Sequence, residues 1–329
     1  MQSWRLVEVT HESSPEEREQ VTKFWEGWYI WSTKSRLEKP WGGEKYGFWA
    51  AFIGSFCIGT SSYTISSRGQ GILSQVHTDP DFRRKGIART TTHAVIESFR
   101  KYGARAVYLA AWSDWIRDIY RKEGFVFAGA MGERHAFKLT LADSGKDENL
   151  FRPGQRTLFR QLDIGDQCDL SSLFNSKHPL VVKHYDLGCY LGSHFEGEFY
   201  ILRNQKVTGI VAEEKGDKKG FRALVLDGEE TIMGLGTVIP SSRRHEQHTG
   251  IIDILLNPNY GEKMSELLDR LEENCELDHL TVYLETHEEA KRKVFERAGY
   301  RKLGELGSQL KIGSEYYDLV AYRKNLKHG

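Results

Sequence analysis

The stretch S-Q-V-H-T-D-P-D-F-R-R-K-G-I-A-R-T-T-T-H-A-V, residues 74–95, decides the fold of this chain. An apolar segment ends near Thr78, three cations follow, and Gly86 leads into a periodic segment. The periodic positions, three and four residues apart, are Ala88, Thr91, Val95, Phe99 and Tyr102. This spacing places one apolar stripe along a helix. The stretch therefore predicts a strand, a glycine-containing turn and a helix in succession.

Such a turn has the chemistry of an anion site. The first N–H groups of a helix lack intrahelical partners and lie at the positive end of the helix dipole. Gly86 would let the backbone approach a ligand closely, and the cations Arg83, Arg84 and Lys85 would add charge-assisted contacts to a pyrophosphate. A basic tripeptide before a helix is also common as a solvated loop, so its surroundings have to decide.

The surrounding segments predict an α/β domain. Ahead of the turn we expect a strand at 4–9, a helix from Ser14 that runs into the aromatic segment 21–31, and strands at 47–54, 57–66 and 71–78. After the helix, which should stop at Gly103, we expect a buried strand at 106–112, a second helix at 113–124, and closing strands at 125–129 and 135–142. We place this N-terminal domain at residues 1–148, a polar linker at 149–155 and a second domain at 156–329.

The second domain repeats the first. The segment N-P-N-Y at 257–260 is similar to D-P-D-F at 79–82, and T-V-Y-L-E-T at 281–286 is similar to A-V-Y-L-A-A at 106–111. Seventeen positions separate Val107 from Gly124, and the same number separate Val282 from Gly299. Two short matches at equal separation indicate two copies of one fold.

The residues resemble one known family. Arg83-x-x-Gly86-x-Ala88 resembles the (Gln/Arg)-x-x-Gly-x-(Gly/Ala) coenzyme A motif of the GNAT superfamily of N-acetyltransferases. The family's downstream pattern is matched at Ser113, Ile116, Tyr120, Gly124 and Phe125, with Ser113 standing where the family usually has Asn. The resemblance implies two GNAT-like folds in tandem, each a mixed, mostly antiparallel sheet flanked by helices, and implies acetyl-CoA as co-substrate with no metal.

The resemblance also implies site residues. A bulge near residues 75–77 would turn a backbone N–H toward the thioester carbonyl, where it stabilises the developing oxyanion. Tyr120 would protonate the leaving thiolate as a general acid, whereas without the family pattern packing against Ile116 would be the better interpretation. The implied coenzyme-binding residues are Gln75, Val76, His77, Thr78, Arg83, Arg84, Lys85, Gly86, Ile87, Ala88, Ser113 and Tyr120.

The general base and the acceptor are less determined. No carboxylate lies between residues 68 and 78, so a water chain, a residue of the aromatic helix or His77 could serve, and the base is left unassigned. Trp25, Trp28 and Tyr29, with Trp31 and Trp41, either bind the amine acceptor by stacking and cation-π contact or belong to the core and a domain interface. The expected acceptor is a small-molecule or peptide amine.

The second copy has lost the key residues. Its turn, N-P-N-Y-G-E-K, has no Arg-x-x-Gly-x-Ala, and Glu262 would repel a phosphate. Phe295 stands at the position that matches Tyr120, and the copy is three residues shorter between Pro258 and Val282 than the first between its landmarks, a loss expected near the turn. The C-terminal copy is therefore expected to cover the acceptor site or to provide an interface. A homodimer is possible.

Composition limits the other functions. The 46 basic and 46 acidic side chains cancel, so neither nucleic acid nor a membrane is expected as a partner. Four widely spaced cysteines and no recognisable signal peptide favour a cytoplasmic protein. Two alternatives to the acetyltransferase remain: an aminoacyl transferase of related fold, and an acyl-CoA-binding sensor or scaffold without catalysis.

Overall fold

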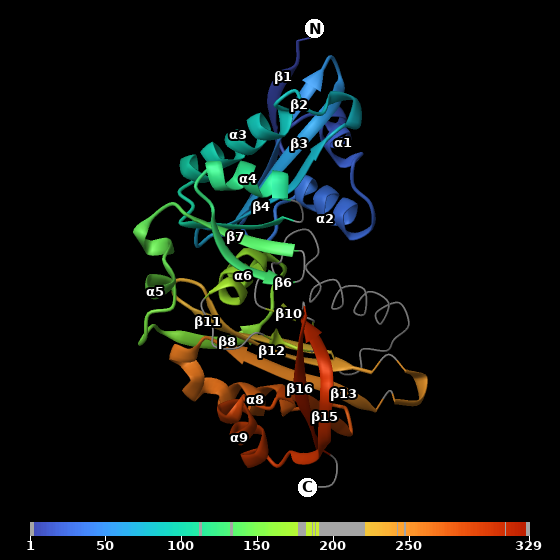
Figure 1. Cartoon of the computed structure of the whole chain (residues 1–329), viewed down its shortest axis with the longest axis vertical. Helices are drawn as coiled ribbons and strands as arrows, with labels where there is room; N and C mark the ends of the chain where they lie inside the picture. The colour runs from blue at the N-terminus through green and yellow to red at the C-terminus, as the bar shows by residue number, and fades with distance from the viewer. Residues whose placement is uncertain are drawn as a thin grey trace.

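The computed structural model describes residues 3–111, 114–131, 134–176, 182–185, 187, 189–190, 221–241, 243–246, 248–312 and 314–326. Over these residues the chain forms two seven-stranded sheets, each flanked by helices. Figure 1 shows the N-terminal unit, blue to green, at one end of the molecule and the C-terminal unit, yellow to red, at the other. No helix in the described part is long and apolar enough to cross a membrane.

The first sheet has the strand order β1-β2-β3-β4-β5-β7-β6, in which β4 and β5 pair in parallel and the other neighbours pair antiparallel. Its strands are β1 (Arg5–Val9), β2 (Lys45–Ile53), β3 (Phe56–Ile65), β4 (Gln70–Thr78), β5 (Ala106–Ala111), β6 (Val126–Met131) and β7 (Arg134–Thr140). Its helices are α1 (Pro15–Thr22), α2 (Gly27–Glu38), α3 (Ile87–Lys101) and α4 (Asp114–Lys122).

The N-terminal helix begins as expected but does not continue as expected. Ser14 caps α1, accepting a hydrogen bond from the Glu17 backbone N–H at 3.2 Å, and Pro15 occupies the first turn. The helix expected to run through residues 21–31 is broken, because α1 ends at Thr22 and Gly27 has a φ of 55°, outside the right-handed helical region. The aromatic segment therefore belongs mostly to α2.

The second sheet has the order β8-β11-β12-β13-β14-β16-β15, again with one parallel pair, β13 with β14. Its strands are β8 (Thr157–Gln161), β11 (Arg222–Gly228), β12 (Ile232–Pro240), β13 (Thr249–Leu256), β14 (His279–Glu285), β15 (Arg301–Ile312) and β16 (Glu315–Asn325). Its main helices are α6 (Gln167–Asn175), α8 (Met264–Glu272) and α9 (Glu289–Arg297), while α5 (Asp147–Leu150), β9 (Val182–His184) and β10 (Cys189–Tyr190) are short. The same connectivity in both halves confirms the tandem prediction.

Each sheet buries the apolar face of its helices. In the first unit Phe99 of α3 packs in one cluster with Val107 of β5 and Phe137 of β7. In the second unit Leu267 and Leu271 of α8 pack with Phe295 of α9 in a larger cluster. Burying one such side chain contributes about 1.5–3 kcal/mol, so these clusters hold the helices against the sheets.

Helix α6 joins the two units. All nine of its residues are buried, and it packs against β4 of the first sheet and β12 of the second, as Figure 1 shows by its position between the sheets. Arg68 of the first unit pairs with Asp169 of α6 at 3.1 Å and with Asp227 of β11 at 2.5 Å. The interface therefore contains ion pairs between buried and partly buried side chains as well as apolar contacts.

Candidate active site

The end of β4 carries a bulge where the sequence predicts one. The pairing of β4 with β3 joins Ser62 to Ser74 and Thr60 to His77, so β4 contains one extra residue between these pairs. Gln75 takes up the excess with a φ of 54°, a left-handed conformation that is unfavourable for a residue with a Cβ. The backbone is thus bent at the point where the predicted N–H donor lies.

A cavity opens at the carboxyl end of β4. Strand β4 pairs with β5 only from Gln70–Ile72 to Ala106–Tyr108, and a hollow of about 600 Å³ lies beyond, between β4, the turn and α4. Its lining residues are Val76, His77, Thr78, Arg83, Arg84, Gly86, Ile87, Ala88, Arg89, Ile116 and Ile119. The structure therefore brings most of the predicted coenzyme-binding residues to one cavity.

The turn after β4 has the geometry of an anion cradle. Residues Pro80–Phe82 form a short 3-10 turn, Arg84 has a φ of 63°, and Gly86 caps α3 with a φ of 81°. A Cβ on Gly86 would meet no protein atom within 4 Å, so the space in front of it is open. The N–H groups of the first turn of α3 begin at this open space.

The cations of the turn are available to a ligand. Arg83 and Lys85 donate to backbone carbonyls, of Thr78 at 3.3 Å and of Asp81 at 3.2 Å. Arg83, Arg84 and Lys85 are exposed, and none of the ion pairs found among described residues involves them. Their positive charge adds to that of the helix N-terminus.

Two of the predicted residues, Gln75 and Lys85, lie outside the cavity lining, and a third is not described. Gln75 points its side chain away into a buried polar network rather than into the cavity. Lys85 lies with its ammonium 4.8 Å from the centre of the Phe82 ring, outside the cavity lining. Ser113 falls outside the described residues, so the structure does not describe the expected pantetheine contact.

Tyr120 lies buried beside the cavity. It follows Ile119, which lines the cavity, and its ring packs edge to face on Phe125 with 5.9 Å between centroids. The side chain is 3% exposed and belongs to the apolar cluster beneath α3. Tyr120 therefore adjoins a lining residue of the cavity without being one of the lining residues itself.

His77 is held at the mouth of the cavity by aromatic rings. Its imidazole stacks on Phe24 at 4.4 Å between centroids, and Trp25 lies edge-on at 6.0 Å. Burial and the nearby Arg83 guanidinium lower the pKa of His77 below its usual value. The imidazole is therefore neutral near pH 7 and able to accept a proton.

The aromatic cluster divides into two groups. Trp25 and Tyr29 lie together, 6.1 Å between ring centroids, on the side of His77. Trp31 instead packs on Trp41 at 5.5 Å. The structure does not describe the side chain of Trp28. In the first group Trp25 contacts His77, which lines the cavity, whereas the second group belongs to packing around α2.

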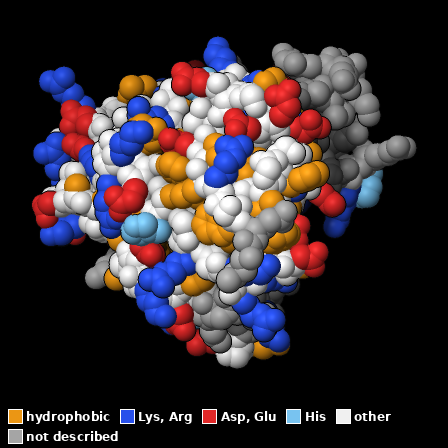
Figure 2. All heavy atoms as spheres, turned by 90° about the horizontal axis from the view of Figure 1, so that it is seen from above, with side chains coloured by type: hydrophobic (Ala, Val, Ile, Leu, Met, Phe, Trp, Pro, Cys, Tyr) orange, Lys and Arg blue, Asp and Glu red, His pale blue; other side chains and the backbone are white. Residues whose placement is uncertain are grey.

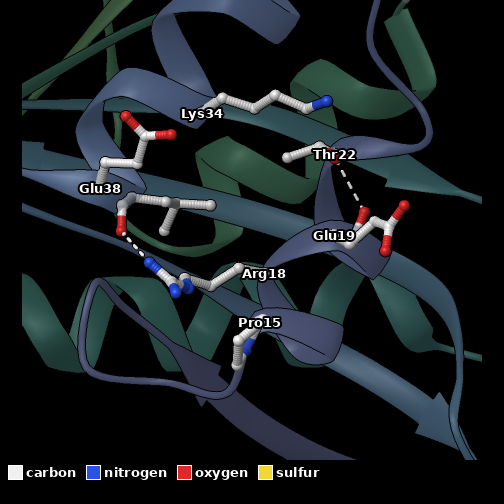
Figure 3. Close-up of a pocket in the computed structure, with 7 residues that line it drawn as sticks. Pro15, Arg18, Glu19, Thr22, Lys34 and Glu38 are labelled. Atoms are coloured by element: carbon white, nitrogen blue, oxygen red, sulfur yellow. Dashed lines mark hydrogen bonds between the residues drawn. The ribbon is translucent and has the colours of Figure 1, made fainter.

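A separate, smaller hollow of about 250 Å³ lies between α1 and α2. Figure 3 shows Lys34 and Glu38 of α2 facing Arg18 and Glu19 of α1 across it, with Arg18 donating to the Leu37 carbonyl at 2.9 Å. This bond ties the two helices together. The hollow contains no element of the β4 cradle, and we assign it no role.

The corresponding region of the second unit differs at every point. Strand β13 pairs with β12 from Gly250 to Leu256 without a register shift, so it has no bulge. Phe295, fully buried against Tyr300, supplies no hydroxyl. The turn from Pro258 to the start of α8 is only one residue shorter than the turn from Pro80 to the start of α3. Most of the shortening lies in the helix, because α8 has nine residues and α3 has 15. The expectation that the missing residues fall at the turn was wrong.

The gap between β13 and β14 is filled by the chain itself. These strands pair only at 249–251 with 279–281, and the segment 182–185 bridges them beyond that point. The Val182 N–H donates to Glu285 of β14 at 3.1 Å, and the Tyr185 N–H donates to Asp253 of β13 at 2.8 Å. His184 and Lys291 also contact Asp253, at 3.3 and 2.5 Å. Sequence reasoning missed this segment, because its contacts are long-range.

Charges of both signs are interspersed over the face that Figure 2 shows, which is seen from the N-terminal end of Figure 1. This face therefore carries no wide basic field.

A mixed sheet with one parallel pair, a bulged strand at that pair and an exposed basic turn before the following helix define an α/β protein with a candidate anion site. Residues 5–125 match the model of the acetyltransferase (GNAT) family. The N-terminal unit belongs to that family, and the C-terminal unit repeats its fold.

Solved structures of the same kind are similar to about half of the chain. An acetyltransferase of the GNAT family from Streptococcus pneumoniae is 16% identical, with a TM-score of 0.39, over 52% of this chain and 99% of that one. A phosphinothricin acetyltransferase from Sinorhizobium meliloti, solved with AcCoA, is 14% identical, with a TM-score of 0.42, over 53% and 90%. Ribosomal-protein-S5-alanine acetyltransferase from Vibrio fischeri is 19% identical, with a TM-score of 0.40, over 54% and 96%. No curated protein sequence matches this chain.

Proposed function

We propose that the protein is an acyl-CoA-dependent N-acyltransferase that transfers acetyl from acetyl-CoA to a primary amine, with its active site in the N-terminal unit. One observation carries the proposal: the open space at Gly86, the cations Arg83 and Arg84 and the bulged strand border the same cavity of about 600 Å³. A pyrophosphate fits the cradle by charge, and an extended arm fits the cavity beside Val76 and Ile116.

In the proposed reaction the amine nitrogen attacks the thioester carbonyl carbon, the carbon–sulfur bond breaks, and an amide and free coenzyme A result. A backbone N–H of the β4 bulge would donate to the carbonyl oxygen as negative charge develops there. Tyr120 would give its proton to the leaving sulfur. His77 lines the cavity and has a lowered pKa. It would accept the amine proton directly or through water, and we leave the general base unassigned.

The acceptor would approach from the side of Trp25, whose ring lies against His77, and of Tyr29, which packs on Trp25. Aromatic faces beside a proton acceptor suit an amine carried on an apolar or aromatic body, whether a small molecule or a peptide. Nucleic acid and membrane are not expected as partners. A cytoplasmic location remains an expectation. Whether the chain forms a homodimer remains open.

Tyr120→Phe tests the chemistry. Because the ring stays buried and only the hydroxyl is lost, we expect thiol release from acetyl-CoA with an amine panel to fall by roughly 100-fold, the range of general-acid effects. The matched control is Tyr300→Phe, a buried tyrosine of the C-terminal unit, which should leave the rate unchanged.

The same assay separates the alternatives. Unchanged turnover of Tyr120→Phe across pH would remove this residue from the mechanism. Binding of acetyl-CoA without thiol release toward any amine would favour a sensor. Loss of the aminoacyl group from aminoacylated tRNA to an amine, with no thiol release from acetyl-CoA, would favour an aminoacyl transferase. A mass-spectrometric search of lysate supplied with labelled acetyl-CoA would then identify the acceptor.

A further inference from the structure

We propose that a buried polar network holds the β4 bulge in the shape that acyl transfer requires, and that the C-terminal unit supplies one end of this network. The inference rests on the proposed function of the N-terminal unit. The members, from the C-terminal unit to the bulge, are Gln167, Arg36, Glu44, Tyr46, Thr33 and Gln75.

The bulge is clamped at Gln75 from two sides. Its side-chain oxygen accepts from the Tyr46 hydroxyl at 2.9 Å, and its side-chain nitrogen donates to Thr33 Oγ1 at 2.7 Å. Its backbone carbonyl accepts from Thr60 Oγ1 at 3.0 Å. A left-handed conformation is unfavourable for a residue with a Cβ, so the conformation at φ 54° persists only because its surroundings determine it.

Arg36 connects this clamp to the second unit. Its guanidinium lies 3.9 Å from the centre of the Trp41 ring and 5.2 Å from that of Tyr46. It donates from Nε to Glu44 at 2.7 Å and from Nη2 to Gln167 Oε1 of α6. Arg36, Glu44 and Gln167 are at most 5% exposed, so hydrogen bonds within the protein take the place of hydrogen bonds to water.

The second unit shows the alternative arrangement. Its strand β13 pairs without a shift, and its gap is filled by residues 182–185. The bulge is therefore not inherent in the sheet topology, which both units share, but depends on the side chains around it. We infer that Gln75, Tyr46, Thr33 and Gln167 are positioning residues, which act through the backbone and do not touch the reacting atoms.

The test uses Tyr46→Phe and Gln167→Met in the full chain, read by the infrared carbonyl band of ¹³C-acetyl-CoA bound to the protein. In the unaltered protein the bulge N–H should shift the band to lower frequency. We expect both variants to lose much of this shift and kcat to fall about tenfold, while the Kd for coenzyme A changes less than about twofold, a pattern specific to transition-state contacts.

Two controls separate positioning from general loosening. Ser62→Ala removes the buried Ser62–Ser74 contact of 2.9 Å on the same strands, and Asp169→Asn weakens the ion pair with Arg68 on the same helix as Gln167. Both should keep the band shift. If they lose it as fully as the network variants do, or if Tyr46→Phe keeps it, the proposal is overturned.

Amide hydrogen exchange of residues 70–78 without ligand separates this inference from the proposed function. Faster exchange there in Tyr46→Phe and Gln167→Met, but not in Asp169→Asn, is expected. Unchanged exchange overturns the positioning role even if acetyl-CoA binds. Absence of any acetyl-CoA binding by the unaltered protein overturns the proposed function, and with it the catalytic meaning of the network.

Discussion

Gly86 is the residue at which backbone geometry and ligand chemistry meet most directly. Its φ of 81° lies in the left-handed region, which favours glycine. The space where a Cβ would stand is open, and Gly86 lines the cavity. Glycine serves both needs, since it adopts this conformation without cost and exposes the N–H groups that follow.

Gly86→Ala should therefore weaken ligand binding more than it weakens the fold. We expect the free energy of unfolding to drop by about 1 kcal/mol from the conformational cost, and the Kd for coenzyme A to rise by about tenfold or more, equivalent to ~1.4 kcal/mol, because the new methyl group faces the ligand. Urea unfolding and calorimetry measure the two effects.

Gly154→Ala is the matched control. Gly154 has a φ of 80° and open space around its Cβ position, but it lies in the connection between the units. Its substitution should cost similar stability and leave the Kd unchanged. An equal loss of affinity in both variants would contradict the assignment of the cradle.

The residues of the cradle could be predicted from sequence because they are local. Arg83 to Ala88 follow one another, and their role depends on a turn and a helix start that short-range patterns reveal. The partners of Gln75, Thr33 and Tyr46, could not be predicted, because they are distant in sequence and meet it only through the packing of α2 and β2. The same holds for Gln167 of α6, which accepts from Arg36. A buried hydrogen-bond network leaves no periodic signal.

Among the elements, the short strand β9 distinguishes the two units. It carries Lys183, 1% exposed, whose ammonium donates to the Ser176 carbonyl at 2.7 Å. Burial lowers the pKa of Lys183 to about 7, with Asp147 partly opposing the shift. The buried amine is therefore easily deprotonated, unlike Lys291, whose pKa is raised despite burial because Asp253 and Glu288 surround it.

Lys183→Met should stabilise the protein near neutral pH. In the unaltered chain the unfolded state binds more protons than the folded state between pH 7 and the ordinary lysine pKa, so the free energy of unfolding rises with pH there. Between pH 7 and 9 the variant should lack this rise, and its advantage should shrink as pH increases. Urea denaturation at several pH values measures it.

Lys291→Met provides the opposite case. It leaves Asp253 buried without its ion pair of 2.5 Å, so we expect a loss of about 3–5 kcal/mol with little dependence on pH between 7 and 9. If Lys183→Met is as destabilising as Lys291→Met, the interpretation that β9 carries a buried lysine whose pKa is lowered by burial is wrong.

The helices and strands were largely predictable, and the exceptions have physical causes. Strands β1 to β5 and helix α3 follow alternation, β-branched content and helical spacing that the sequence displays. The break between α1 and α2 was missed, since apolar periodicity continues across Gly27 although its backbone leaves the helical region. The segment 182–185 carries no strong strand pattern, because its contacts are to carboxylates of other strands.

At the scale of the whole molecule, one fold occurs twice with different contents. Both sheets have the same order of strands and one parallel pair at which the strands separate. In the first unit a cavity lies there, and in the second the chain fills the gap. Helix α6 of the filled unit packs on β4 of the open one, which suggests that the second copy persists as a support for the first.

The most direct test of this account is calorimetric titration of the full chain with acetyl-CoA. We expect one molecule bound per chain, loss of binding in Arg83→Ala/Arg84→Ala, and unchanged binding in Lys263→Ala, which alters the corresponding turn of the second unit. Two molecules bound per chain, or one that survives the change at Arg83 and Arg84, would contradict it.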